Sequence, residues 1–327
     1  VGCVKEIKKY EFRVGMTPSN VKSYVQAGHE VYIEKGAGEG SGFTDEEYAE
    51  GGATLLDTAK EVWDISEMMI KVKEPLPEEY PLFHKDLILY TYLHLAADKA
   101  QTDALMEAGV KGVAYETLWD NGLPLLAPMS QIAGRLSVQE GAKYLEKIFG
   151  GEGVLLSGVP GTPKANVLIL GGGAVGTNAC KIAVGMGANV TITDININRL
   201  SYLDDIFGAR IQTLYSTDAA IEEEIKKADL VVGSVLIPGA AAPKIVKEKY
   251  LKMMKKGAVI VDVAVDQGGC CETTKVTYHD DPIFIQDDVV HYCVGNMPGA
   301  VPRTSTIALT NATLRYGLQI AGKGLEQ

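Results

Sequence analysis

The segment VLILGGGAVG, residues 167–176, constrains the fold of this chain more than any other feature. An apolar run leads into a G-x-G-x-x-G pattern at Gly171, Gly173 and Gly176, and we expect a helix to begin near Val175. In such a strand–turn–helix unit the first glycine permits a tight turn, the second lets a pyrophosphate reach the backbone, and the third allows close helix–strand packing. The segment therefore predicts a dinucleotide-binding βαβ unit.

An acidic residue at the end of the next predicted strand supports this interpretation. The strand at 189–193 is followed by Asp194, about 20 residues beyond the loop, where a carboxylate holds ribose hydroxyls. Asp194 would repel a 2′-phosphate, and Ile195 and Asn196 bring no cation to receive one, so NAD is favoured over NADP. The alternative is a glycine loop that only makes a turn or binds another nucleotide, as in methyltransferases.

Short apolar runs recur along the chain and alternate with helix-like or loop segments. Runs of this kind, bounded by turn residues, are typical of parallel strands covered on both faces. The predicted strands are 29–35, 67–72, 87–93 and 110–115 before the glycine loop, and 166–170, 189–193, 229–233 and 258–265 around and after it. The pattern predicts an α/β fold of two Rossmann-like domains with parallel, doubly wound sheets and a substrate cleft between them.

The chain of 327 residues is about twice as long as a typical domain of roughly 150 residues. A long helix is predicted over 128–150, a Gly/Pro-rich loop at 150–163 is expected to be the hinge, and a helix over 305–323 is expected to return to the first domain. We therefore expect a substrate domain of residues 1–128 and 300–327, and an NAD-binding domain of residues 129–299.

Composition excludes several classes of protein. A net charge of −11 disfavours nucleic acid and anionic membranes as partners. No apolar run is long enough for a membrane helix, and no secretion signal is seen, so we expect a soluble cytoplasmic protein. The 5 cysteines are odd in number and form no C-x-x-C pair, which argues against a disulfide framework or a zinc site. The adjacent Cys270 and Cys271 are expected to be free thiols.

Four charged or titratable residues stand where predicted elements end. Arg13 precedes a predicted helix start, Lys73 and His94 follow predicted strands of the first domain, and Asp266 follows the last predicted strand of the second, whereas Asp262 is expected to be structural. Arginine binds carboxylates bidentately and histidine exchanges protons near neutral pH. Each residue alone is more often a solvated or backbone-bonded side chain. Together with an NAD domain they indicate hydride transfer to or from a small amino or hydroxy acid.

Ordered sequence blocks over essentially the whole chain resemble the alanine dehydrogenase / NAD(P) transhydrogenase α-subunit family. The matching blocks are EFRVGMTP, GHEVYIEKGAGEGSGFTDEEY, IKVKEP, LHLAA, YET, LPLLAPMSQIAGR, LILGGGAVGTNA, VDVAVDQGG, VGNMPGAVPRTST and ALTNAT.

The resemblance implies an NAD-dependent, cytoplasmic and homohexameric enzyme that interconverts L-alanine with pyruvate and ammonium. The alternatives are the NAD-binding subunit of a proton-translocating transhydrogenase, a related small amino-acid dehydrogenase, and a non-enzymatic NAD-sensing module. The block LHLAA, which carries His94, favours the dehydrogenase, because the transhydrogenase subunit uses no catalytic histidine on a substrate.

The resemblance also implies roles for individual residues. Arg13 and Lys73 would bind the substrate carboxylate and keto oxygen, His94 would donate and accept the proton, and Asp266 would be the second catalytic acid. The implied NAD contacts are Ser130, Gly171, Gly173, Ala174, Val175, Gly176, Asp194, Arg199, Ser216, Val235, Leu236, Val263, Val294, Gly295, Asn296 and Met297.

Two departures from the family pattern lie near the C-terminus. The magnesium-linked acid and histidine of the family fall on Gln319 and Lys323 here, so no metal is expected at that place. The chain reaches only to Gln327, which is earlier than the family pattern, and we expect this to affect oligomer contacts more than catalysis.

Overall fold

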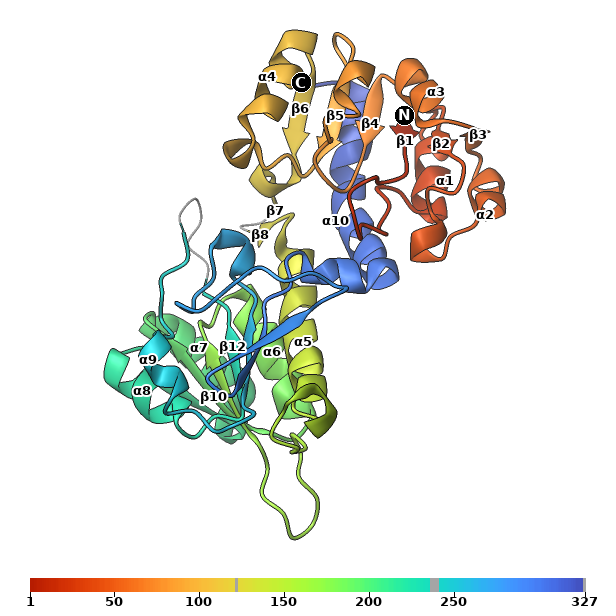
Figure 1. The fold of residues 1–327 in the computed structure, drawn as a ribbon. Coiled ribbons are helices and arrows are strands. Elements are labelled where there is room, and N and C mark those ends of the chain that lie inside the picture. The colour runs from red at the N-terminus through yellow and green to blue at the C-terminus, as the bar shows by residue number, and fades with distance from the viewer. Residues whose placement is uncertain (121–122, 236–240, 326–327) are drawn as a thin grey trace. The chain divides into compact units, whose positions relative to one another are not determined.

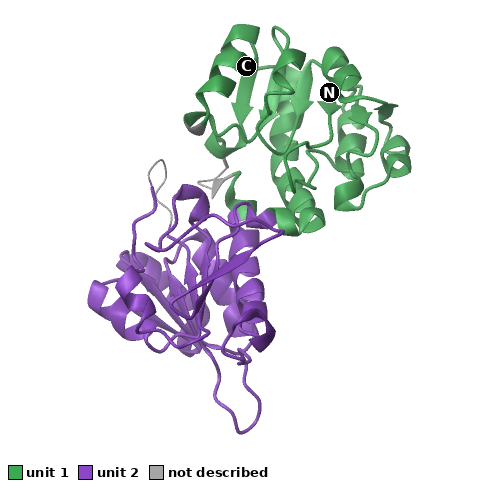
Figure 2. Ribbon diagram, viewed as in Figure 1, with its two compact units in different colours: residues 1–129, 299–327 green, residues 130–298 purple. Residues whose placement is uncertain are grey.

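A computed structural model describes residues 1–120, 123–235 and 241–325 (Figure 1). The chain forms two compact units, residues 1–129 with 299–327, and residues 130–298 (Figure 2). The expected boundaries differ from these by one residue. The hinge prediction for 150–163 is wrong, because that loop lies inside the second unit and the chain passes between the units within helix α5 (Ala127–Tyr144).

The first unit is built on a six-stranded sheet in the order β3-β2-β1-β4-β5-β6. Every pair of neighbours in it is parallel. The strands are β1 (Gly2–Cys3), β2 (Tyr32–Glu34), β3 (Thr54–Leu56), β4 (Met68–Ile70), β5 (Ile88–Thr91) and β6 (Lys111–Ala114). Four of them were predicted, whereas β1 and β3 are too short to stand out as apolar runs.

The helices described in the first unit begin at a side-chain N-cap, except for the last one. They are α1 (Pro18–Gln26), α2 (Asp45–Glu50), α3 (Ala59–Ile65), α4 (Lys99–Ala108) and α10 (Pro302–Lys323). Thr17, Thr44 and Thr58 each form a capping box, which satisfies backbone N–H groups that have no partner within the helix. As expected, α10 returns to this unit and runs along its strands (Figure 1), where the Tyr90 hydroxyl donates to the Thr313 carbonyl at 3.0 Å.

The second unit contains a seven-stranded sheet in the order β11-β10-β9-β12-β13-β15-β14. Its strands are β9 (Asn166–Leu170), β10 (Asn189–Asp194), β11 (Ile211–Tyr215), β12 (Leu230–Gly233), β13 (Val259–Asp262), β14 (Ile283–Gln286) and β15 (Val289–Tyr292). All neighbours are parallel except β14 and β15. That antiparallel edge was not predicted; Asp287 and Asp288, with φ of 49° and 62°, make the tight turn that a two-residue hairpin requires.

Strand β9 pairs with β10 on one side and β12 on the other, so the order reverses there. Such a switch point is where open α/β sheets bind ligands, beyond the carboxyl ends of the strands. The helices of this unit are α5, α6 (Ala174–Gly185), α7 (Ile197–Phe207), α8 (Asp218–Ile225) and α9 (Glu248–Leu251). Side chains of α8 and α9 share one buried apolar cluster with β9, β12 and β13.

A two-stranded antiparallel pair, β7 (Trp119–Asp120) and β8 (Leu123–Pro124), precedes α5. In the described part of the chain, no helix is both long and apolar enough to cross a membrane.

Candidate active site and nucleotide loop

The glycine loop of the second unit has the geometry that its sequence predicts. Gly171 adopts φ of +97°, which permits the tight turn after β9. A Cβ on Gly173 would enter open space, so the backbone there is accessible to a ligand. A Cβ on Gly176 would collide with the Gly171 carbonyl oxygen, so only glycine lets α6 pack this closely on β9. Helix α6 begins at Ala174, close to the expected start, and its first N–H groups favour an anionic ligand.

Asp194 and Arg199 hold this loop from the neighbouring strand and helix. The Asp194 carboxylate accepts from the Gly172 N–H at 2.7 Å and from the Asn196 N–H at 2.8 Å. Arg199 donates to the Gly172 carbonyl and, through Nη2, to the Thr177 hydroxyl at 2.6 Å. Residues 195 and 196 bring no cation, but the first turn of α7 brings Arg199 to the loop.

The other expected cofactor residues come from segments that follow strands, with one exception. Ser130, Ala174 and Val175 lie in α5 and the first turn of α6. Ser216, Val235 and Val263 follow β11, β12 and β13, and residues 294–297 follow β15. Leu236 lies outside the described residues. Of the residues that the structure describes, all but Ser130 therefore belong to the carboxyl edge of the sheet, where the glycine loop also lies.

In the first unit, Arg13 is a buried cation that forms an ion pair with Glu11. Its side chain is 2% exposed and donates through Nε to Glu11 Oε1 at 2.6 Å, with a second ion-pair contact through Nη2. Nη1 faces the Met129 sulfur at 3.1 Å. Sequence reasoning missed Glu11. This carboxylate occupies the Nε and Nη2 edge of the guanidinium and fixes its plane.

Lys73 lies just beyond β4, beside Arg13. Its backbone N–H donates to Glu6 Oε1 at 3.3 Å, and the same oxygen accepts from the Val72 N–H at 2.6 Å. Glu6 in turn is buried against the ammonium of Lys71, which also pairs with Glu79 at 2.9 Å. This ionic cluster, which the sequence did not reveal, fixes the backbone of the strand end.

The ammonium of Lys73 makes no hydrogen bond or ion pair to any residue that the structure describes. Burial, together with the positive charge of Arg13, lowers the pKa of Lys73. Two cations held close together in a partly buried place attract an anionic group, because such a group relieves their repulsion.

His94 follows β5, the neighbour of β4 in the sheet. Its Nδ1 lies 2.9 Å from Glu74 Oε2, and its backbone N–H donates to Glu116 Oε1 at 2.6 Å. The side chain is 42% exposed, so the ring is accessible. The structure places Lys73 and His94 after neighbouring strands of the first unit, with Arg13 near Lys73, and adds Glu74 as a neighbour of both Lys73 and His94.

Asp262 and Asp266 differ in their surroundings. Asp262 ends β13, and its buried carboxylate accepts from the N–H groups of Ala264 at 3.1 Å and Cys270 at 2.9 Å, as well as from the Thr274 hydroxyl. It shapes the following loop, in keeping with its expected structural role. Asp266 lies on that loop in a short 3₁₀ helix (Val265–Gln267) and accepts from the Asn296 N–H at 3.3 Å.

One group of metal-ligand atoms occurs in the described residues, formed by Asp262, Cys270 and Cys271 within 4.8 Å of one another. The Asp262 carboxylate is already used by three backbone N–H groups. Burial helps to raise the pKa of both thiols, which opposes the thiolate form that metals need. We therefore assign this cluster a structural role.

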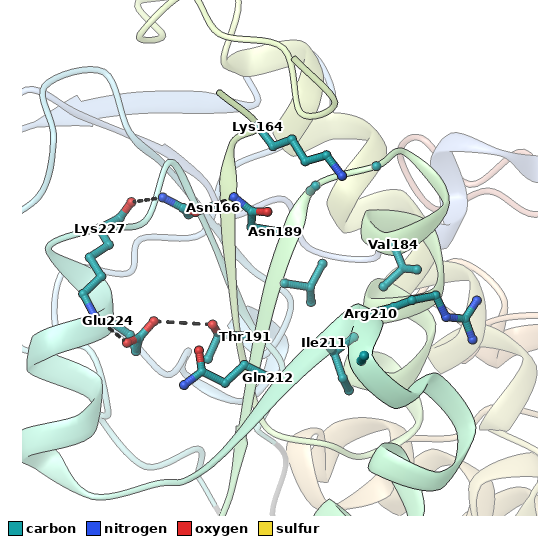
Figure 3. A pocket seen from close by; sticks show the side chains of 14 residues that line it. Lys164, Asn166, Val184, Asn189, Thr191, Arg210, Ile211, Gln212, Glu224 and Lys227 are labelled. Carbon is teal, nitrogen blue, oxygen red and sulfur yellow. Dashed lines mark hydrogen bonds and ion pairs between the residues drawn. The ribbon is translucent and has the colours of Figure 1, made fainter. Parts of the chain in front are cut away.

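A pocket of about 660 Å³ lies on the second unit (Figure 3). It is lined by Asn166, Asn189 and Ile211, the first residues of β9, β10 and β11, and by polar side chains around them. Because the three strands are parallel, these residues mark the amino edge of the sheet. The pocket is thus at the opposite edge from the glycine loop and does not belong to the nucleotide site.

Comparisons with known proteins agree with this arrangement. Family models described as "Alanine dehydrogenase/PNT, N-terminal domain" and "C-terminal domain" match residues 2–133 and 137–327. An alanine dehydrogenase of Methanococcus maripaludis is 60% identical over 100% of this chain and 88% of its own length. Alanine dehydrogenase 2 of Staphylococcus aureus is 55% identical with the same coverage.

Two solved structures resemble the chain closely. One, titled L-alanine dehydrogenase, has a TM-score of 0.97 and 55% identity over 99% of this chain and 90% of that one. A transhydrogenase from Sinorhizobium meliloti has a TM-score of 0.90 but 23% identity, over 99% of this chain and 94% of that one, and shows the shared fold alone. The two family models together span nearly all of the sequence, and the chain therefore belongs to the alanine dehydrogenase/PNT family.

Proposed function

We propose that this chain is an NAD-dependent L-alanine dehydrogenase, which interconverts L-alanine with pyruvate and ammonium. Relatives that are 55–60% identical over the whole chain carry this name. The likeness to a transhydrogenase rests on 23% identity and does not support that alternative. The single observation that carries the proposal is the Lys73 ammonium, which has no protein partner among the described residues. It lies near the buried Arg13, at the strand edge that also carries the accessible His94.

The second unit fits NAD. The open space at Gly173 and the N-terminus of α6 would receive the pyrophosphate. Asp194, which follows the next strand and contacts the loop at Gly172, would bind ribose hydroxyls. The other residues assigned to this cofactor by family resemblance, including Ser130, Arg199 and residues 294–297, remain proposals. NAD when bound supplies the hydride acceptor for oxidation and, in its reduced form, the hydride donor.

The first unit supplies the groups that hold the substrate. Arg13 would bind the carboxylate of alanine or pyruvate, and Lys73 the carboxylate or keto oxygen. Holding the substrate by two cations restricts its rotation, and correct orientation removes several kcal/mol from a reaction barrier. The ion pair of Arg13 with Glu11 keeps that orientation fixed.

Proton transfer is assigned to His94 and Asp266. His94 is accessible and would take a proton from, or return it to, the oxygen or nitrogen on the substrate carbon. Asp266, which lies on a loop shaped by Asp262, would orient the water or ammonium that adds to this carbon, a role that the family resemblance implies. General acid–base groups of this kind contribute about 10²–10⁴-fold to a rate.

We also propose that the enzyme works in the cytoplasm as a homo-oligomer, a hexamer by family resemblance. All five cysteines are free and buried, which is in keeping with a reducing compartment. Light scattering on a sizing column measures the oligomer, and a mass near 35.0 kDa would contradict it.

The test of the proposed activity is oxidation of NADH by the purified chain, followed by absorbance. We expect rapid oxidation that requires both pyruvate and ammonium, and much slower oxidation of NADPH. Glyoxylate and 2-oxobutyrate, run in parallel, would define the side chain that is accepted. Tight NADH binding without turnover would overturn the proposal in favour of a transhydrogenase-like or sensing module.

A further inference from the structure

We infer that Glu74 is a positioning residue for His94. The Glu74 carboxylate fixes the orientation of the His94 ring, so that Nε2 is the nitrogen that exchanges the proton. The inference rests on the proposed function. Glu74 Oε2 lies 2.9 Å from His94 Nδ1, and its other oxygen pairs with the Lys8 ammonium. The Glu74 side chain is only 15% exposed, so the carboxylate cannot readily exchange these partners for water.

Contacts to the backbone of His94 hold this residue in place independently of the contact between its ring and Glu74. His94 has a left-handed conformation, with φ of 50° and ψ of 34°, which costs energy for a residue other than glycine. Glu116 compensates by accepting from the N–H groups of both Leu93, at 3.0 Å, and His94, at 2.6 Å. The ring also stacks on Tyr92, with centroids 5.9 Å apart.

The loops that carry Glu74 and His94 are tied together. The Thr91 hydroxyl, at the end of β5, donates to the Lys73 carbonyl at 3.0 Å. Because Lys73 directly precedes Glu74, this hydrogen bond sets the distance between the carboxylate and the histidine that follows β5. The contact between the two side chains therefore follows from the arrangement of neighbouring strand ends.

A carboxylate only accepts hydrogen bonds, so its contact with Nδ1 requires that Nδ1 carry a hydrogen. The second ring nitrogen, Nε2, is then the one that can take a proton from the substrate and return it. When Nε2 is protonated the ring becomes cationic, and the adjacent Glu74 stabilises that charge. One proton moves between the substrate atom and Nε2, and Glu74 itself gains none.

Glu74 is kept ionised by the cations around it. Burial raises the pKa of its carboxyl group, but the hydrogen bonds from His94 and Lys8 and the charge of Lys73 outweigh burial and lower it below its ordinary range. The charged groups that face this pair are Lys8, Lys73 and the Glu116 carboxylate at the His94 backbone.

The test compares Glu74→Gln, which removes the charge but keeps the shape, with Glu74→Asp, which keeps the charge. We expect Glu74→Gln to lower kcat about 10-fold or more with a smaller change in KM for pyruvate, since an orienting carboxylate acts on proton transfer. Glu74→Asp should recover part of that loss. Glu223→Gln, at an exposed carboxylate paired with Lys226, is the matched control and should leave kcat unchanged.

Two further measurements separate positioning from a general structural role. In a His94→Ala background, Glu74→Gln should change kcat less than about twofold, because a residue that acts through His94 has no effect without it. An equal loss in both backgrounds would overturn the inference. In ¹⁵N-histidine spectra, His94 should be protonated at Nδ1 in the parent enzyme and lose this preference in Glu74→Ala.

These outcomes also distinguish the inference from the proposed activity. If the parent enzyme oxidises NADH with pyruvate and ammonium but Glu74→Gln matches it in kcat, only the role of Glu74 fails. If the parent enzyme itself shows no such turnover, the proposed function fails, while the ¹⁵N spectra still report whether Glu74 orients the ring.

Discussion

The Cβ position of Gly176 points at the carbonyl oxygen of Gly171, across the turn that joins β9 to α6. The same Cβ position lies 2.9 Å from the Ser234 hydroxyl oxygen, which itself donates to the Gly171 carbonyl at 2.9 Å. Neither neighbour is the free end of a flexible side chain, so the space cannot open cheaply. The third glycine of the loop is therefore required by packing, and the loop geometry depends on it.

Gly176→Ala should destabilise the second unit by roughly 3 kcal/mol, at the upper end of ordinary overpacking, because the added methyl group meets backbone. Gly185→Ala is the matched control, since a Cβ at this other glycine of α6 would meet nothing within 4 Å. Alanine there should stabilise the helix by about 0.5–1 kcal/mol. Urea unfolding of both variants measures the difference, and equal stabilities would refute the packing argument.

Asp194→Ala should reduce the preference for NADH over NADPH, because the carboxylate that would repel a 2′-phosphate is removed. It should also weaken NADH binding, since Asp194 holds the Gly172 and Asn196 N–H groups. The informative quantity is thus the ratio of kcat/KM for the two cofactors. A ratio unchanged from the parent enzyme would mean that the ribose lies elsewhere.

Pyruvate binding should weaken at alkaline pH through Lys73. Its pKa is lowered by burial and by the charge of Arg13. The Lys73 ammonium therefore loses its proton, and with it its charge, at a lower pH than an ordinary lysine, whose pKa is near 10.4. Losing a hydrogen bond to a charged group costs about 1.5–3 kcal/mol, or roughly 10-fold or more in the dissociation constant.

The measurement is the dissociation constant of pyruvate from the enzyme–NADH complex as a function of pH. It is made without ammonium, so that titration of ammonium does not contribute. Lys73→Arg keeps its charge over the whole range and should bind pyruvate with little pH dependence. A parent enzyme whose affinity is constant to pH 10.4 would contradict the assigned role of Lys73.

The sequence predicted the fold where local signals and burial agree. The run at 166–170 coincides with β9, and each glycine of the loop has the expected surroundings. The short strands β1 and β3 were missed because two or three residues carry no periodicity, although pairing with neighbours makes them strands. The misplaced hinge at 150–163 came from treating glycine and proline content as the sign of a hinge, although the predicted domain boundary lay at 128.

The site was predicted only in part, because sequence patterns identify residues at strand ends but not their partners. Glu74 belongs to the same IKVKEP block as Lys73, yet nothing in that block reveals that it contacts His94, 20 residues further along. Nothing in the sequence marks Glu11 and Glu6 as the buried partners of Arg13 and Lys71. Such pairs arise from the sheet order, which brings distant segments together.

Acidification below about pH 6.5 should destabilise the second unit through His291. This residue of β15 is fully buried; its Nδ1 lies 3.0 Å from the Val289 carbonyl and its Nε2 2.9 Å from the Thr273 hydroxyl. The carbonyl requires a hydrogen on Nδ1, so Nε2 accepts from Thr273 and the neutral ring is satisfied at both nitrogens. Burial lowers the pKa of His291.

Acidification lowers the stability of the fold because the unfolded chain binds the His291 proton more tightly than the folded chain does. The unfolded chain protonates His291 near pH 6.5, while the folded chain resists until a lower pH, so stability is fully present above that value and falls as the pH decreases. One such group contributes a slope of up to about 1.4 kcal/mol per pH unit. Glu11 and Glu74, whose pKa values are lowered on folding, act below about pH 4.5. Burial raises the pKa values of Glu6, Glu34 and Glu152, and these acids add a slope of the opposite sign, so His291 is isolated by comparing the parent protein with a variant that lacks it.

Urea unfolding at a series of pH values from 7.5 to 5 measures the slope. His291→Gln, which cannot take up a proton, should flatten it even if the variant is less stable overall, because the slope and not the absolute stability reports the titration. Equal slopes for the parent protein and His291→Gln between pH 6.5 and 5 would show that His291 binds its proton equally well in the folded and unfolded chain.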